Sequence, residues 1–355
     1  MPDLNLEQIL PDQMETALER LQPSERVQNG FSVGAIHVAI FGQSAMDVAL
    51  VKPLEPFRRE CGCCDIGINV EWLPSISRPG GEAVFDSGTT WRLHEADGEF
   101  AFDFHSPGRS SDPFKRLIID RNFRSAALQM NGAYFASLDS VPEPLGYPLD
   151  ELLIMHRLTQ EQAIELHGAG IVRANGEANL FIGHSGAGKS TTTRLWTAME
   201  DVEVLSDDRI IVRRDGNISA VQTPRMATGN HGEHGVLRLR DRLASPIGHS
   251  AQDDRQRMRM YGTPWHGEAV YASPNSAPLT RIFVLEHGHG NVITPLNPSQ
   301  AVAELFARSF VPFHQHEYVD SALGFLEELA NAVPVYRYAF EPDKRAVEKI
   351  RNFHD

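Results

Sequence analysis

A short glycine-rich segment in the middle of the chain restricts the possible folds more than any other feature of the sequence. It reads Gly183-His-Ser-Gly-Ala-Gly-Lys-Ser190 and fits the pattern G-x-x-x-x-G-K-[ST]. An apolar run from Asn179 to Ile182 precedes it, and a helical pattern from Lys189 to Glu200 follows it. A strand, such a loop and a helix in this order are typical of a P-loop in an α/β protein.

Each residue type in the loop has a physical reason to be there. The glycines allow backbone N–H groups to converge on phosphate oxygens. The helix that begins near Lys189 directs the positive end of its dipole at the same anion. Lys189 supplies a positive charge for the β and γ phosphates, and the Ser190 hydroxyl is a ligand for Mg²⁺. We therefore expect ATP and Mg²⁺ as cofactors, with a nucleotide site formed by Gly183, His184, Ser185, Gly186, Ala187, Gly188, Lys189, Ser190 and Thr191.

Two adjacent carboxylates, Asp207 and Asp208, follow closely behind the loop. We expect the helix to carry the chain back along the sheet and the run from Val202 to Leu205 to return parallel to the strand that feeds the loop. The carboxyl end of such a strand lies beside the phosphates, where α/β sheets bind their ligands. One carboxylate can hold Mg²⁺, and the other can accept a proton from an attacking hydroxyl. An ordinary Asp-rich turn is the alternative interpretation.

The apolar pattern divides the chain into two predicted domains, residues 1–145 and residues 146–355. The first is predicted to be mainly β, with β-like runs at Val33 to Phe41, Met46 to Val51, Trp91 to His105 and Lys115 to Ile119. The proline-rich segment from Val141 to Pro148 is the expected linker, because Pro cannot donate a backbone hydrogen bond. The second domain carries the P-loop.

Helical and β-like patterns alternate in the second domain. A helix is predicted from Leu149 to about Leu158, followed by a hairpin of Ala163 to Val172 against Asn179 to Ile182 that turns at Asn175-Gly176. The later predicted elements are a hairpin from Ile210 to Val221, a strand from Thr280 to Leu285, a helix opened by Asn297-Pro298, a helix from about Val319 to Ala332, a strand from Val335 to Phe340 and a last helix. The predicted fold class is therefore α/β.

Charge and composition argue against several classes of protein. A net charge of −14 disfavours nucleic-acid binding, which depends on Lys and Arg to neutralise phosphates. The apolar runs are shorter than the roughly 20 residues of a membrane-spanning helix, and the first residues show no export signal. The three cysteines, Cys61, Cys63 and Cys64, form an odd and crowded set that suits a reducing compartment. We expect a cytoplasmic protein with no nucleic-acid or membrane partner.

Three segments together resemble the C-terminal domain of HPr kinase/phosphorylase. They are Leu166-His-Gly-Ala-Gly170, the loop from Gly183 to Ser190, and Leu205-Ser-Asp-Asp208. That family shares its fold with ATP-dependent phosphoenolpyruvate carboxykinase, and the resemblance covers roughly residues 150–355. It implies a phosphoenolpyruvate carboxykinase/HPr kinase-like P-loop domain, which a mainly β N-terminal domain precedes here.

The resemblance also implies roles for particular residues. Asp208 is the expected base, Asp207 its partner on the metal side, and His167 the histidine near the transferred phosphate. A histidine packed in a strand is the alternative for His167. The expected catalytic residues are thus Asp208, Lys189 and His167.

The sequence departs from the family at two places. Thr191 stands where HPr kinases carry Glu, and the family's signature with its metal-binding Glu is absent. The segment Gly262-Thr-Pro-Trp-His-Gly-Glu268 occupies its place, so Glu268 is a candidate to replace the missing ligand, with a turn carboxylate as the alternative. The expected metal ligands are Ser190, Asp207 and Glu268.

The implied activity is transfer of the γ-phosphoryl group of ATP to a hydroxyl, with serine of a peptide or protein as the expected acceptor. A kinase of small hydroxylated molecules is one alternative. A regulatory module that binds nucleotide without phosphotransfer is another. The oligomeric state is left open, with a homo-oligomer as one option.

Overall fold

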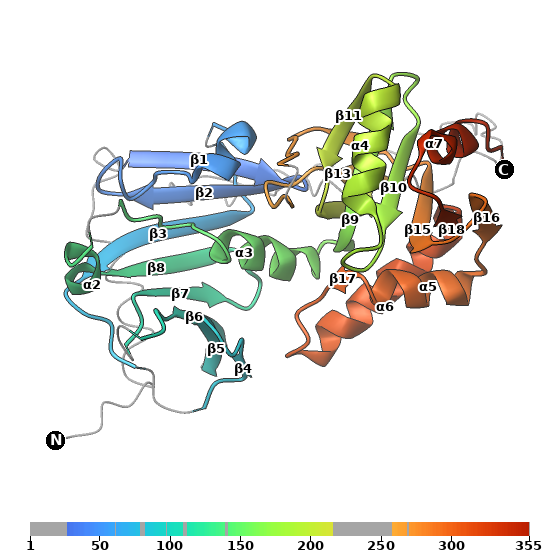
Figure 1. Ribbon diagram of the computed structural model, residues 1–355. Helices are drawn as coiled ribbons and strands as arrows, with labels where there is room; N and C mark the ends of the chain where they lie inside the picture. The colour runs from blue at the N-terminus through green and yellow to red at the C-terminus, as the bar shows by residue number, and fades with distance from the viewer. Residues whose placement is uncertain are drawn as a thin grey trace, which may run out of the picture.

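The computed structural model describes residues 27–215 and 258–354, apart from residues 61, 79–81, 97, 109–111, 139–140 and 268–269. These residues form two mixed β-sheets with accompanying helices, so the α/β prediction is confirmed. Figure 1 shows the two sheets side by side, the first in blue to teal and the second in green to orange-red. None of the described helices is both long and apolar enough to span a membrane.

The first sheet contains eight strands in the order β1-β2-β3-β8-β7-β6-β5-β4. They are β1 (Val27–Val33), β2 (Ile36–Gly42), β3 (Ile66–Leu73), β4 (Phe85–Asp86), β5 (Trp91–Ala96), β6 (Glu99–Phe104), β7 (Lys115–Asp120) and β8 (Ser125–Asn131). β3 pairs in parallel with β2 and β8, and the other neighbours are antiparallel. The 3₁₀ helix η2 (Lys52–Phe57) and the helix α2 (Gly132–Ala136) also belong to this part of the chain.

The structure corrects two predictions for this sheet. The run from Val33 to Phe41 is divided between two strands, because Gly34 and Ala35 adopt positive φ angles and turn the chain. The predicted strand from Met46 to Val51 is wrong. There the Asp47 carboxylate accepts two backbone N–H groups from the residues just before it and holds a turn. A short acidic side chain offers the backbone this alternative to strand pairing.

The second sheet follows the order β14-β13-β12-β9-β10-β15-β18-β16, and β11 and β17 also pair with β9. Its strands are β9 (Ala163–Arg173), β10 (Ala178–Ile182), β11 (Val202–Ser206), β12 (Arg209–Arg214), β13 (Met258–Tyr261), β14 (Ser276–Pro278), β15 (Arg281–His287), β16 (Val292–Pro295), β17 (Ser309–Phe310) and β18 (Val335–Phe340). The helices in this part of the chain are α3 (Leu149–Leu158), α4 (Lys189–Met199), α5 (Pro298–Phe306), α6 (His316–Ala332) and α7 (Lys344–Arg351).

Most elements predicted for this part of the chain are confirmed. The hairpin of β9 and β10 is present, with Gly176 at positive φ in its turn. The Asn297 side chain caps α5 with a reciprocal bond to Gln300, as a helix opened by Asn-Pro requires. β12 confirms the first half of the predicted hairpin from Ile210 to Val221, and the second half lies outside the described residues.

Strand β9 changes its neighbours on both edges at the same place. On one edge it pairs with β12 through residues 163–167 and with β11 through residues 170–173. On the other edge it pairs with β17 at residues 165–166 and with β10 at residues 168–172. Both changes fall near His167 and Gly168. β10 and β11 are each antiparallel to β9, so they run in the same direction, as predicted, with β9 between them.

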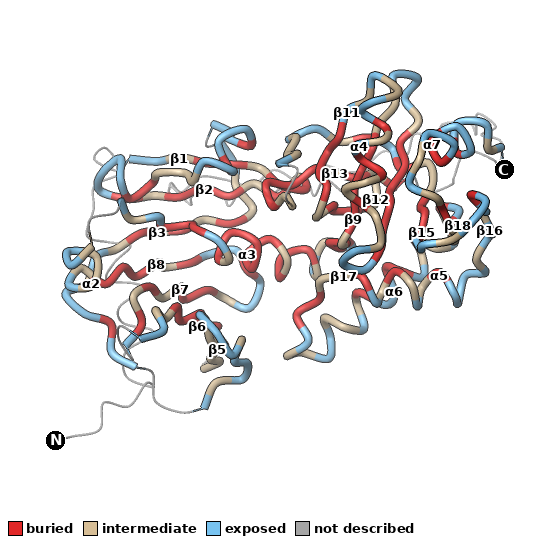
Figure 2. The backbone as a smooth tube through the Cα atoms, viewed as in Figure 1, coloured by how far each residue is buried: buried red, intermediate tan, exposed pale blue. Residues whose placement is uncertain are grey.

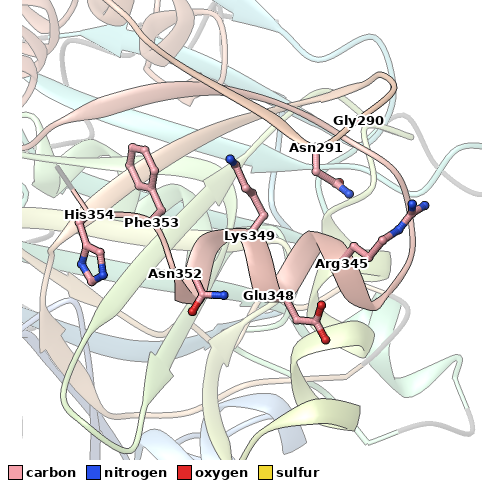
Figure 3. Close-up of a pocket in the computed structure, with 8 residues that line it drawn as sticks. All are labelled: Gly290, Asn291, Arg345, Glu348, Lys349, Asn352, Phe353 and His354. Atoms are coloured by element: carbon pink, nitrogen blue, oxygen red, sulfur yellow. The ribbon is translucent and has the colours of Figure 1, made fainter.

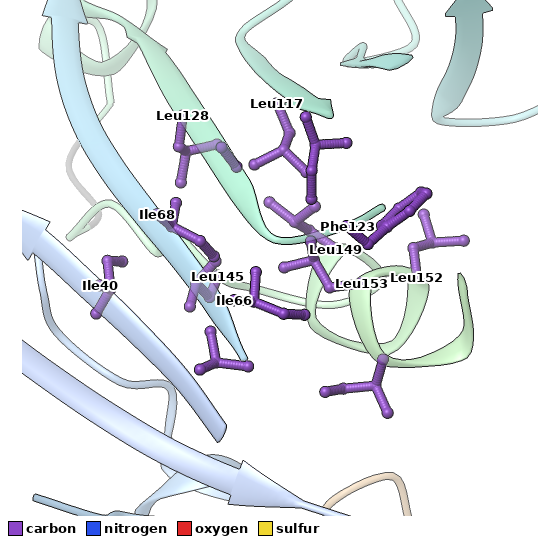
Figure 4. Packing of buried hydrophobic residues seen from close by; sticks show 14 of the residues in the cluster. Ile40, Ile66, Ile68, Leu117, Phe123, Leu128, Leu145, Leu149, Leu152 and Leu153 are labelled. Atoms are coloured by element: carbon purple, nitrogen blue, oxygen red, sulfur yellow. The ribbon is translucent and has the colours of Figure 1, made fainter. Parts of the chain in front are cut away.

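Helix α3 packs into the core of the first sheet, although the sequence assigned it to the second domain. Leu149, Leu152 and Leu153 of this helix belong to the same buried cluster as Ile66 and Leu117 of the first sheet. Figure 4 shows these side chains meeting at close range. Buried residues occur in both sheets and along α3 in Figure 2. Helix α3 therefore joins the hydrophobic core of one sheet to the chain that enters the other.

Candidate functional site

The glycine-rich loop lies between β10 and α4, in the position that the sequence predicts. β10 is buried throughout, whereas His184, Ser185 and Gly186 are exposed. Gly186 and Gly188 have φ angles of 80° and 103°, in the left-handed region that favours glycine. The loop thus leaves the buried sheet and presents its backbone to solvent at the end of β10.

The N-terminus of α4 has no side-chain cap. Gly188 is its N-cap residue. A Cβ atom at Gly188 would lie 2.5 Å from Cζ of Phe340, so only glycine fits between the loop and β18. The first N–H groups of a helix have no partner within the helix and bind phosphate well. The loop residues therefore fit the phosphate groups of a nucleotide.

The Lys189 side chain folds back beneath the loop. Its Nζ donates to the carbonyl oxygens of Gly183 at 2.9 Å and His184 at 3.2 Å, and to Nε2 of His167 at 2.8 Å. Lys189 is only 7% exposed. Burial lowers its pKa to about 8, and the Asp208 carboxylate opposes this effect. The ammonium group is held next to the loop with a proton that it can lose in the mildly alkaline range.

His167 links Lys189 to Asp208. Its Nδ1 lies 3.2 Å from Oδ1 of Asp208 and 3.2 Å from the Asp208 carbonyl oxygen. Because Nε2 accepts from the Lys189 ammonium, Nδ1 carries the ring proton and donates it to Asp208. Burial, followed by the positive charge of Lys189, lowers the pKa of His167 and so favours this neutral ring. The three residues predicted to be catalytic form one chain of contacts.

The predicted metal ligands are described only in part. Asp207 is buried, and its Oδ1 accepts the backbone N–H of Gly267 at 3.0 Å. Ser190 lies in the first turn of α4. Glu268 lies outside the described residues, and the residues that are described contain no group of three or more His, Cys, Asp or Glu side chains able to hold a metal. The metal set Ser190, Asp207 and Glu268 remains a prediction.

Arg209 belongs to the site but was not identified from the sequence. Its guanidinium group forms ion pairs with Asp208 and with Glu151, the latter at 2.7 Å, and lies 4.1 Å above the ring of Phe310. It also approaches the fully buried Glu165 at 3.3 Å, where burial raises the pKa of that carboxyl group. Its position directly after the two aspartates was the one feature of the sequence that could have indicated a role in the site.

Two further residues reach the candidate site from distant parts of the chain. The Arg308 carbonyl accepts the N–H of His167 at 2.7 Å, and the charge of Arg308 helps to lower the pKa of Lys189. His287 Nε2 lies 2.8 Å from the Gly186 carbonyl oxygen. His287 was not identified as a site residue from the sequence. Its place at the end of β15, the parallel neighbour of β10, is where an α/β sheet brings side chains to a ligand.

A pocket of about 590 Å³ lies along α7, away from these residues (Figure 3). Asn291, Arg345 and Phe353 contribute to its lining, and none of the residues predicted for the site does. We place the candidate site at the loop because the contacts of Lys189 and His167 converge there.

No protein-family model matches the sequence, and no curated protein is significantly similar to it. The interpretation of the site therefore depends on its own residues and geometry.

Proposed function

We propose that this chain is an ATP-dependent kinase that transfers the γ-phosphoryl group to a hydroxyl, with serine of a peptide or protein as the acceptor. The main support is the chain of contacts from Lys189 through His167 to Asp208, at 2.8 Å and 3.2 Å, directly behind the glycine-rich loop. A loop alone supports nucleotide binding. A carboxylate beside it supports transfer, because a kinase also needs a group that accepts the proton of the attacking hydroxyl.

Each residue has a defined task in this proposal. The loop N–H groups and Lys189 bind the phosphates, and Ser190 and Asp207 hold Mg²⁺. ATP supplies the phosphoryl group, and Mg²⁺ neutralises its charge. Asp208 accepts the hydroxyl proton, while His167 keeps Asp208 oriented by donating its Nδ1 proton. The resemblance to HPr kinase/phosphorylase supports the same assignment.

We further propose that the second sheet has the phosphoenolpyruvate carboxykinase/HPr kinase-like P-loop fold. The support is the entry into the loop: β10 is the second strand of an antiparallel hairpin with β9. Most P-loop proteins enter their loop from a βαβ unit instead. In the middle of β9, Gly168, Ala169 and Gly170 also pair directly with β10.

Calorimetric binding of MgATP and MgADP to the wild type and to Lys189→Ala tests the phosphate site. We expect the variant to bind at least tenfold more weakly, a loss of about 1.4 kcal/mol. Lys52→Ala is the matched control, because Lys52 is exposed and lies in η2, outside the candidate site. Absence of binding to the wild type, or equal binding to Lys189→Ala, would contradict the proposal.

The acceptor can be identified with γ-labelled MgATP and a cell extract. Label on a peptide or protein serine is the expected result. Label on a small molecule alone would favour the small-molecule kinase. Tight nucleotide binding with no transfer at all would favour the regulatory module.

A further inference from the structure

Helix α3 carries two adjacent acidic residues, Asp150 and Glu151, that are both buried. Their helix packs with Leu149, Leu152 and Leu153 into the core of the first sheet. Buried carboxylates are costly unless they are paired or hydrogen-bonded. Their partners therefore show what this part of the helix stabilises.

Glu151 reaches one of the two site aspartates through Arg209. Its Oε1 accepts from Nε of Arg209 at 2.7 Å, and Nη1 of the same guanidinium pairs with Oδ2 of Asp208. The ring of Phe310 covers the guanidinium at 4.1 Å. Because the planar group is held on two sides and covered by a ring, it fixes the direction in which the Asp208 carboxylate points.

Asp150 reaches the other aspartate through the segment that contains Trp265. Its Oδ2 accepts the indole N–H of Trp265 at 2.9 Å. Two residues further along, the N–H of Gly267 donates to Oδ1 of Asp207 at 3.0 Å. The backbone of this segment is also tied to the strands, because the Thr263 hydroxyl donates to the Arg209 carbonyl at 2.8 Å.

We propose that α3 positions both site aspartates, Asp208 through Glu151 and Arg209, and Asp207 through Asp150 and Trp265. The first sheet thereby acts as the support of the catalytic carboxylates, a role that its own residues do not indicate. Glu151, Arg209, Asp150 and Trp265 are positioning residues in this scheme. The expected effect on catalysis rests on the proposed kinase function. The positioning of the two aspartates by α3 can be tested without it.

The geometric test is amide hydrogen exchange in the segments 206–209 and 262–267. We expect Glu151→Ala to raise exchange at 206–209 at least tenfold, and Trp265→Phe, which keeps an aromatic ring but lacks the N–H donor, to raise it at 262–267. Glu151→Gln keeps an acceptor for Arg209 and should restore most of the protection. Glu161→Ala is the matched control: it removes ion pairs of the same kind, with Arg213 and Arg157, that do not reach either aspartate.

The catalytic test compares MgATP affinity with the rate of γ-phosphoryl transfer to water. We expect Glu151→Ala to slow transfer at least tenfold while the Kd for MgATP changes less than twofold, and Glu151→Gln to recover most of the rate. Exchange and rate equal to wild type in Glu151→Ala, or equal effects in Glu161→Ala, would overturn the proposal. If exchange responds as expected but the wild type binds no nucleotide, the positioning stands and the kinase function fails.

Discussion

The two sheets both bury charged side chains, but they satisfy them in different ways. In the first sheet, Asp103 is fully buried and forms a two-bond ion pair with Arg116, at 2.5 Å and 2.9 Å. Beside the second sheet, Lys189 donates a hydrogen bond to His167, and His167 donates one to Asp208. This chain of hydrogen bonds ends at the exposed glycine-rich loop. An ion pair whose two charges neutralise each other stabilises the fold, whereas a chain of hydrogen bonds that reaches solvent can bind a ligand.

The two sheets also differ in how continuously their strands pair. In the first sheet, neighbours such as β1 and β2 or β5 and β6 pair along their whole length. In the second sheet, β9 changes its pairing partners near His167 and Gly168, so the ends of several strands meet there. The site lies where regular pairing is interrupted, because interruption frees side chains and backbone groups that a continuous ladder would occupy.

The largest expected effect belongs to Asp208→Asn. The amide keeps the shape of the side chain but cannot accept the hydroxyl proton, so transfer should fall by about 10³-fold, within the range typical of a general base. MgATP affinity should stay within threefold of wild type. Calorimetry measures the affinity, and transfer of label from γ-labelled MgATP measures the rate. A parallel loss of binding and transfer would contradict the role of Asp208 as the base.

A core substitution in the first sheet should lower the stability of the fold and leave nucleotide binding unchanged. Phe102→Ala empties a buried position in the cluster around α3 and should lower the free energy of unfolding by about 3 kcal/mol. Below the melting temperature, MgATP affinity should not change. Phe85→Ala, at an exposed position, is the control and should have little effect on either quantity. A weakened nucleotide affinity in Phe102→Ala would remove the contrast between the sheets.

Two glycines with similar backbone angles sharpen the comparison. Gly98 has φ of 85° in the hairpin of β5 and β6, where an added Cβ would meet nothing within 4 Å. Gly98→Ala should therefore cost only the backbone strain, about 1 kcal/mol. Gly188→Ala adds a clash with Phe340 and should cost at least twice as much in unfolding free energy, and MgATP affinity should fall at least tenfold. Equal stability losses from the two variants would contradict this reasoning.

The smallest expected effect is a change in protonation. Burial lowers the pKa of Lys189 to about 8 from 10.5, so between these values the folded state binds fewer protons than the unfolded state. The contribution of this residue to stability therefore rises as the pH increases through that window. A bound triphosphate favours the charged ammonium and raises the pKa again. Calorimetry near pH 8.5 in two buffers of different ionisation enthalpy should show proton uptake when MgATP binds, and proton release would contradict this.

The sequence predicted the elements around the loop well because their signals are local. The Asn175-Gly176 turn, the apolar run of β10 and the glycines of the loop all lie within a few residues of each other. Lys189 and Asp208 could be named as candidates for the same reason. By contrast, Arg308 reaches His167 and His287 reaches Gly186 from more than 100 residues away in the sequence, through contacts that no local pattern encodes.

The position of α3 could not be predicted for a different reason. Its apolar residues fit any hydrophobic surface, so their spacing predicts a helix but does not say which sheet the helix covers. The roles of Asp150 and Glu151 follow only from the packing that the structure shows. Met46 to Val51 failed as a strand because the turn-forming capacity of Asp47 outweighed the apolar run around it.

The exchange of partners along β9 has a consequence for the order of folding. All strands of the first sheet lie within residues 27–131, so this sheet can pair as soon as that part of the chain has been synthesised. β9 is made soon afterwards, but its residues 165 and 166 pair with residues 310 and 309. Closing so long a loop is slow, because the entropy must be lost before the contact is gained. We therefore expect the nascent chain to carry a finished first sheet and an incomplete candidate site until β17 leaves the ribosome.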